Sequence, residues 1–438
     1  MLSRRKFLGM AGGVAAGTAA GGGALWAALM RDHVEQALVN PSATTTTTMR
    51  ASGAANNDRV LVVVQLGGGN DGLNTLIPDL GRYRDARPTL AIADAARVDI
   101  GATGYALHPS LAPLQRRWKS GQIAAFDGVG LHSQSRSHFK AMDTWWAGTD
   151  GGATSTGWLG RWLDATEAAT PNPLRAIALG TGAPALVGAR SLPTVVLSPS
   201  QFALRLPRAT DAKAVTDAFL ATAAPLSTAP WFGAAQQAIP TALDAISLLD
   251  KVRSEAPPVS DFGPATSTTA VSAGTTPKNR LAGDSLSSLL QSAAGIIEMG
   301  LGTRVIFVGV SGYDTHANQL ERHHDLLDDL AQGLSGFFDR LEQRGVAERV
   351  LVMTTSEFGR RVGENASGGT DHGSGGVQFV LGSAVKGKVV GEPALDRLVE
   401  GDVPIGIDAR SLYALGLDWL GGPTDELLGG HFDRYSVV

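Results

Sequence analysis

Five continuous apolar runs constrain the fold of this chain more than any other feature of its sequence. Within each run apolar residues follow one another with little alternation, which is typical of strands that are covered on both faces. The runs are VLVVVQL from Val60, QIAAFDGVG from Gln122, RVIFVGV from Arg304, RVLVMTTSEF from Arg349 and GVQFVLGS from Gly376. They predict strands of a buried sheet.

Two segments with helical periodicity lie among these runs. The first begins at Asp284, which we expect to be the N-cap, and ends at the glycines after Met299. The second ends at Gly345 and repeats apolar residues near the helical period, namely Leu320, Leu327, Leu330, Leu334, Phe337 and Leu341. Alternation of strands and helices predicts an α/β fold, a three-layer α/β/α sandwich with a mostly parallel central sheet.

The amino-terminal region indicates export. Residues 1–30 begin with SRRKFL from Ser3 and continue as a Gly- and Ala-rich apolar stretch, which is the twin-arginine form of an export signal. This signal implies the twin-arginine translocase as a partner and a periplasmic or other extracytoplasmic location. The signal is either cleaved or retained as an N-terminal membrane tether, because no clear small-residue cleavage site follows it.

The rest of the chain is predicted to form one domain. Residues 31–58 are a polar, low-complexity tether, and residues 59–438 are the domain itself. Within it, residues 149–257 are expected to form a cap or insertion beside the site. Residues 254–280, rich in Pro, Ser and Thr, are expected to be a surface linker between two halves that share one sheet.

Composition limits the chemistry that is available. The chain has no cysteine, which excludes disulfides, thiolate zinc sites and iron–sulfur clusters. A metal would have to be held by His, Asp, Glu, Asn or hydroxyl groups, a set that suits Mg, Mn, Ca or Zn. The net charge of -4 over 438 residues gives no basic face, so we expect no nucleic acid partner.

Polar clusters stand at the ends of the predicted strands. GGGNDG, SRSHF, GYDTH and SEFGRR follow the first four runs, and DHGSGG precedes the fifth. Ligands of parallel sheets bind beyond the carboxyl ends of the strands, so we expect most of these clusters at one edge. Each cluster also has a structural interpretation: a tight turn for GGGNDG, an N-cap with a buried histidine for SRSHF, an N-cap at Asp314 or Thr315, and an ion pair of Glu357 with Arg360.

Two further features are interpreted as structural. His323 and His324 lie within the second helical segment and are predicted to be solvated or structural. Asp408 and Arg410, in GIDARSLY, are predicted to form an ion pair that opens the last helix.

The motifs together resemble the DUF1501 family, a group of exported proteins that is similar to the alkaline phosphatase, sulfatase and phosphoglycerate mutase superfamily. The resemblance covers nearly the whole chain after the signal and tether, and implies an alkaline-phosphatase-like fold. The residues that carry it are QLGGGNDGLNTLIP, LHPSLAPL, SRSHFKAMDTWWAG, TGWLGRWLD, GYDTHANQ, TTSEFGRR, DHGSGG and GIDARSLYALGLDWLG.

The resemblance implies a metal site of one or two divalent ions (Zn, Mn, Mg or Ca). Phe358 stands where the superfamily usually has a histidine ligand, which puts the second ion in question. The implied metal ligands are Asp71, Asp314, His316, Glu357 and His372.

It also implies a serine nucleophile at Ser137, with Ser135 as the alternative and His138 beside it. A serine hydroxyl needs activation, and a bound cation lowers the pKa of a coordinated hydroxyl. Candidates for holding an anionic group bidentately are Arg136, Arg360 and Arg361.

Three functions follow as hypotheses. The first is an exported metal-dependent hydrolase of small-molecule or polymeric phosphate or sulfate esters. The second is a protein of the same fold that kept or lost its metal and now binds a glycan, a lipid or a partner protein. The third is an accessory protein of the cell envelope. Metal content and turnover distinguish them.

Overall fold

The computed structural model describes residues 58–133, 135–150, 154–166, 172–199, 214, 217, 245–247, 284–392 and 394–438. The predicted signal (1–30), the tether up to residue 57 and the linker (254–280) lie outside the described residues, as does most of the region 149–257. Within the described part of the chain, no helix combines the length and the apolar character that a membrane crossing requires.

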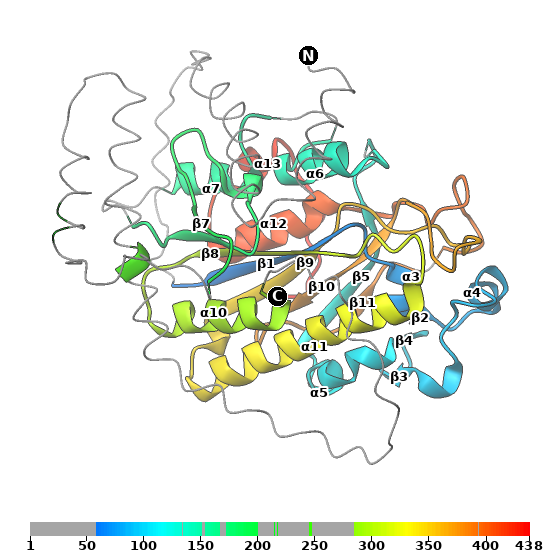
Figure 1. The fold of residues 1–438 in the computed structure, drawn as a ribbon. Helices are drawn as coiled ribbons and strands as arrows, with labels where there is room; N and C mark the ends of the chain where they lie inside the picture. The colour runs from blue at the N-terminus through cyan, green and yellow to red at the C-terminus, as the bar shows by residue number, and fades with distance from the viewer. Residues whose placement is uncertain are drawn as a thin grey trace. The chain divides into compact units, whose positions relative to one another are not determined.

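A central sheet of nine strands runs through the molecule (Figure 1). Its order is β11-β5-β10-β9-β1-β8-β6-β7, and β12 also pairs with β5. The strands are β1 (Val60–Gly67), β5 (Ile123–Gly130), β6 (Ala176–Leu179), β7 (Thr194–Val196), β8 (Val305–Ser311), β9 (Val350–Thr355), β10 (Gly376–Leu381), β11 (Val389–Val390) and β12 (Ile407–Asp408). Strand β10 is antiparallel to both of its neighbours, and the other described pairings of this sheet are parallel.

The five predicted strands are confirmed as β1, β5, β8, β9 and β10. Strands from before and after residues 254–280 hydrogen-bond to one another in one sheet, as predicted. Strands β6 and β7 were not predicted, and they belong to the sheet although they lie in the region 149–257 that we assigned to a cap. Their short length, four and three residues, gives an apolar run too brief to be distinctive.

Helices cover both faces of the sheet. Val62 and Val64 of β1 pack in one core with helices α10 (Leu286–Glu298) and α11 (Gln319–Gln343). Leu61 and Val63 pack in a second core with helices α7 (Trp158–Ala165) and α12 (Ala409–Leu420). Helices α10 and α11 lie on one side of the sheet, and α7 and α12 lie on the other (Figure 1). Alternate side chains of the strand therefore enter opposite apolar layers, which explains why β1 is apolar without alternation.

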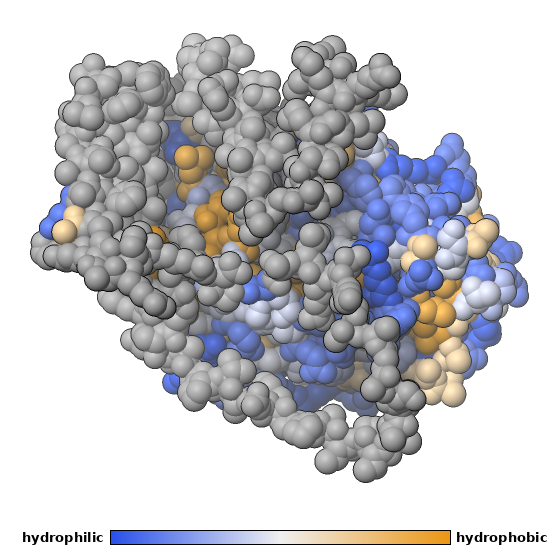
Figure 2. All heavy atoms as spheres, viewed as in Figure 1, coloured by the Kyte–Doolittle hydropathy of each residue, from blue (hydrophilic) through white to orange (hydrophobic). Residues whose placement is uncertain are grey.

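The remaining elements are short. A second, antiparallel sheet contains β2 (Leu76–Pro78), β4 (Tyr105–Leu107) and β3 (Val98–Asp99). The other helices are α3 (Gly72–Thr75), α4 (Gly81–Ala86), α5 (Gln115–Lys119), α6 (His138–Ala147) and α13 (Thr424–Leu428). On the face drawn in Figure 2 the described surface is largely hydrophilic, with a few apolar patches.

The starts of the two long helices differ from the prediction. The N-cap of α10 is Ser285, not Asp284, and its hydroxyl accepts a hydrogen bond from the Ser288 amide at 3.2 Å. The N-cap of α11 is Asn318, in a left-handed conformation, so neither Asp314 nor Thr315 caps this helix. The side chains of the GYDTH motif are thereby left for another role.

A buried ion pair fixes the turn that follows β1. The carboxylate of Asp71 and the guanidinium of Arg87 are both fully buried, and two hydrogen bonds of 2.6 and 2.9 Å join them. The Gln319 amide donates to the same carboxylate. Burial alone raises the pKa of Asp71, but the charge and hydrogen bonds of Arg87 outweigh burial and lower this pKa.

We predict that Arg87→Leu destabilises the fold by about 3–5 kcal/mol, because Asp71 would stay buried without its partner. The double variant Asp71→Asn/Arg87→Leu should recover much of this loss, since it removes the unpaired charge. Denaturant unfolding measures both values. Arg84→Leu is the matched control, because Arg84 pairs with Asp94 at the surface, where a pair contributes less than about 1 kcal/mol. Equal losses for the two single variants would contradict the prediction.

Candidate metal centre

The candidate site lies at the edge of the sheet where β1, β5, β8 and β9 end. Because β10 is antiparallel, its first residue lies at this same edge, and the loop from β9 to β10 stays there. This topology brings together side chains that are far apart in sequence: Asp314 and His316 after β8, Glu357 after β9, His372 before β10, and His138 at the start of α6.

Asp314 is the centre of the group. His372 Nε2 lies 3.0 Å and His316 Nε2 lies 3.1 Å from its Oδ1. His138 Nε2 lies 3.5 Å from its Oδ2. Burial raises the pKa of Asp314, but the hydrogen bond and the charge of the Arg360 guanidinium outweigh it and lower the pKa to about 2. This carboxylate is therefore charged at neutral pH.

The outer nitrogen of each histidine is held by an oxygen acceptor. In each case Nδ1 carries the proton, because a carboxylate or backbone carbonyl oxygen can only accept a hydrogen bond. Nε2 of each ring then faces the centre. The acceptors are Glu357 Oε1 for His138 at 2.9 Å, Asp371 Oδ1 for His316 at 2.9 Å, and the backbone oxygen of Arg136 for His372 at 2.8 Å.

This arrangement fits a cation. A neutral imidazole that donates from Nδ1 presents a lone pair at Nε2. The lone pair of His372 faces the Asp314 carboxylate and also His316 Nε2, which lies 2.9 Å away. A cation between such groups replaces repulsion by coordination, and imidazole nitrogen with carboxylate oxygen is a donor set that zinc accepts. One atom each from His138, Asp314 and His372 lies within 4.8 Å of the other two.

The surroundings of His138 and His372 shift the pKa values of these two imidazoles in opposite directions. The hydrogen bond to Glu357 raises the pKa of His138, against the effect of its partial burial. Burial lowers the pKa of His372, against its hydrogen bond to the backbone oxygen of Arg136. The ring centroids of these histidines are only 4.4 Å apart, so a proton on one disfavours a proton on the other.

Two predicted metal ligands are placed elsewhere. Asp71 does not join the group, because Arg87 and Gln319 occupy its oxygens. Glu357 contacts the site through His138 and is not itself one of the central ligands. Its Oε1 accepts hydrogen bonds from the Gly68 amide at 2.7 Å and from His138. The geometry gives Asp71 a structural ion pair and makes Glu357 the residue that orients His138.

Phe358 forms a wall of the site. Its ring centroid lies 5.1 Å from that of His138 and 4.5 Å from that of His372. A Cβ atom on Gly69 would lie 2.4 Å from this ring, and Gly69 has a φ of +79°. Glycine is therefore required at this position of the GGGNDG motif for close approach as well as for backbone conformation.

The three arginines differ in what they can bind. Arg360 is fully buried, and its guanidinium donates to Asp314 and to the backbone oxygens of Gly68, Gly69, Tyr313 and Thr370. It pairs with Asp314, not with Glu357 as the structural interpretation of SEFGRR supposed, and its buried guanidinium is engaged by acceptors of the protein itself.

Arg136 and Arg361 remain within reach of a ligand. The side chains of both are 39% exposed, and both approach the buried carboxylate of Asp402, Arg136 at 2.5 Å and Arg361 at 3.8 Å. Ser374 also donates to Asp402 at 3.0 Å. Asp402 was not singled out in the sequence, because its loop carries no motif and its partners lie far from it along the chain.

The predicted serines lie on the loop before α6. Ser137 is the N-cap of this helix, without a side-chain capping bond, and is exposed. Its amide donates to the Ser135 hydroxyl at 3.1 Å, so Ser135 shapes the loop. Ser137 directly precedes His138 in the chain.

Of the two histidines in α11 that we predicted to be solvated or structural, His323 is structural and His324 is solvated. His323 is buried, its Nε2 lies 2.9 Å from Asn70 Oδ1, and burial lowers its pKa to about 4. His324 is exposed and contacts the Ser110 hydroxyl at 2.9 Å. Asp408 caps α12 and pairs with Arg410 at 2.6 Å, as expected, but α12 is not the last helix, because α13 follows it.

The structure is similar to several solved proteins at low sequence identity. The C-terminal periplasmic domain of EcEptC from Escherichia coli, in complex with zinc, matches with 10% identity, a TM-score of 0.36, and coverage of 84% of this chain and 83% of that chain. A protein in the alkaline phosphatase superfamily from Vibrio parahaemolyticus matches with 9% identity, a TM-score of 0.39, and coverage of 85% and 69%. The PsFucS1 sulfatase from Pseudoalteromonas sp. matches with 11% identity, a TM-score of 0.36, and coverage of 86% and 70%.

These TM-scores, all below 0.5, carry no functional argument. A search of curated proteins found no match. A family profile, described as "Protein of unknown function (DUF1501)", matches residues 127–435. This range includes the site residues from His138 to His372 and leaves out the GGGNDG motif. Because it spans well over half of the 438 residues, the chain belongs to the DUF1501 family.

Proposed function

We propose that this protein is a metal-dependent hydrolase of phosphate or sulfate esters. The observation that supports the proposal is the convergence of three Nε2 atoms on Asp314, each from a ring whose Nδ1 is fixed by an acceptor. Such outer acceptors are the usual partners of metal-bound histidines. His138, Asp314, His316 and His372 would hold one divalent ion, with zinc favoured by the three imidazoles.

The bound ion would act as a Lewis acid and lower the pKa of a hydroxyl placed beside it. Ser137 supplies that hydroxyl in the proposal, because it is exposed and precedes His138 directly. Glu357 and Asp371 keep the imidazoles oriented. Arg136 and Arg361 offer partly exposed guanidinium groups to the oxygens of an anionic ester.

The arrangement favours one ion over two. The carboxylate expected to open a second metal position, that of Asp71, is engaged with Arg87, and the expected second histidine is the ring of Phe358. These two observations also support the second candidate function, a protein of this fold that binds a ligand without hydrolysing it.

We expect Asp371→Ala to weaken metal binding by about 10–100-fold, because His316 would lose the acceptor that orients its ring. Metal content after dialysis against a graded series of chelator concentrations measures the effect. Asp396→Ala is the matched control, since Asp396 is an exposed carboxylate that pairs only with the exposed Arg397 among the described residues. Unchanged retention in Asp371→Ala would remove the assigned role of Asp371.

Ser137→Ala should retain metal and lose turnover of p-nitrophenyl phosphate and p-nitrophenyl sulfate by roughly 100-fold or more. Ser135→Ala should keep most of the turnover, because Ser135 acts on loop geometry. His316→Ala and His372→Ala should lose both metal and turnover. Elemental analysis measures the metal content of all four variants, and the two ester assays measure their turnover. If the metal-loaded wild type turns over neither ester, the binding function replaces the hydrolase.

The proposal includes export by the twin-arginine translocase, which rests on residues 1–30 alone. Replacing both Arg4 and Arg5 with lysine should leave the full-length chain in the cytoplasm, because the translocase reads the arginine pair. Immunoblots of cytoplasmic and extracytoplasmic fractions measure this, with Arg31→Lys as the control outside the motif. Export of the double variant at the wild-type level would exclude this route.

A further inference from the structure

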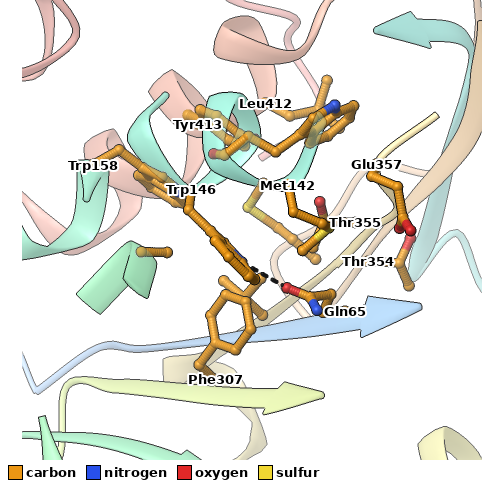
Figure 3. A pocket seen from close by; sticks show the side chains of 14 residues that line it. Gln65, Met142, Trp146, Trp158, Phe307, Thr354, Thr355, Glu357, Leu412 and Tyr413 are labelled. Atoms are coloured by element: carbon orange, nitrogen blue, oxygen red, sulfur yellow. Dashed lines mark hydrogen bonds between the residues drawn. The ribbon is translucent and has the colours of Figure 1, made fainter. Parts of the chain in front are cut away.

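A small cavity adjoins the candidate metal centre on the α6 and α12 side of the sheet (Figure 3). We call it the aromatic slot. Its volume is about 20 Å³. Five aromatic side chains line it, together with Gln65, Thr354, Thr355 and Glu357; they are Trp145, Trp146, Trp158, Phe307 and Tyr413. A cavity of this size admits one compact group and excludes a ring.

Glu357 borders the slot with an unsatisfied oxygen. Its side chain is only 2% exposed, and its Oε1 accepts from Gly68 and His138. Oε2 is buried and has no hydrogen-bond partner among the described residues. The carboxyl group lies beside Thr354, at the opposite end of the slot from Trp158 (Figure 3). A buried carboxylate oxygen without a partner is costly, so a positive charge or a donor is required there.

The lining of the slot selects the kind of charge. Glu357 is the one charged side chain among the described residues that line it. A metal ion would find a single carboxylate there and no imidazole, which is too few ligands. Trp146 donates its indole N–H to Gln65 Oε1 at 2.8 Å, so its polar edge is already satisfied. Aromatic faces around one carboxylate are the surroundings that an organic ammonium group prefers.

We propose that the aromatic slot binds a small organic ammonium group, with Glu357 as its counter-ion. Glu357 accepts a hydrogen bond from His138 with its other oxygen, so the slot and the metal centre are adjacent and share Glu357 as a boundary. Esters that carry an ammonium group a short chain away from the phosphate or sulfate are therefore the preferred substrate class. This link to substrates rests on the proposed function, whereas ammonium binding by the slot does not.

The test is a titration of the full-length protein, followed by tryptophan fluorescence, with ethanolamine and 1-propanol. The second compound has the size and shape of ethanolamine without its charge. We expect saturable fluorescence changes with ethanolamine, and an affinity about 10-fold or more above that of the neutral analogue.

Three variants locate the binding. Trp146→Leu should weaken ammonium binding about 10-fold, and Glu357→Gln should abolish the preference for the charged compound. Met142→Leu is the matched control, because Met142 lines the same slot and the exchange conserves its apolar volume. Thermal unfolding of each variant shows whether it is folded. Where Trp146→Leu or Glu357→Gln is unfolded, the comparison of ethanolamine with 1-propanol on the wild type decides alone.

Two results would overturn the inference: no saturable response to ethanolamine, or equal affinity for ethanolamine and 1-propanol. Neither result depends on metal or turnover, so the inference and the proposed function can fail separately. An enzyme that hydrolyses aryl esters without ammonium binding would retain the function and lose the inference. Ammonium binding without turnover would do the reverse.

Discussion

The buried guanidinium of Arg360 is the interaction on which the candidate site depends. It donates to backbone oxygens in three separate segments, the turn after β1, the loop after β8 and the loop before β10, and it also pairs with Asp314. A buried cation is tolerated because its donors meet acceptors, and the same bonds fix the relative positions of the three segments. Without this connection, His316 and His372 would not be held at a common centre, since they come from loops and not from the strands.

The orientation of the three histidines is set by residues that surround the site. Each histidine meets the centre with Nε2 because Nδ1 is engaged by a neighbour, and these neighbours come from other segments of the chain. Orientation is thereby set by residues that would not touch a bound ion. A carboxylate such as Glu357 can then serve two regions at once, with one oxygen for His138 and the other toward the aromatic slot.

Sequence reasoning identified the sheet well and the site in part, for physical reasons. Strands buried on both faces must be apolar throughout, so β1 and β8 were visible, whereas the short β6 gave too little signal. A polar residue at the end of a buried strand indicates a possible site, yet its role depends on which partner packs against it. Asp71 and Asp314 are both aspartates that follow apolar strands. Asp71 forms an ion pair with Arg87, whereas Asp314 contacts three imidazoles. Spacing along the chain does not encode that difference.

The antiparallel direction of β10 has a consequence for how such a site can change during evolution. A parallel strand requires the chain to return across the whole sheet before it can pair, whereas β9 and β10 are adjacent and joined at one edge. The connecting loop thus has both of its ends at the site, and no crossover of the sheet lies between them. Lengthening or exchanging its middle would alter the rim of the site while the sheet register, the cores and the position of His372 stay as they are. New specificity can be acquired there by insertion, without redesign of the fold.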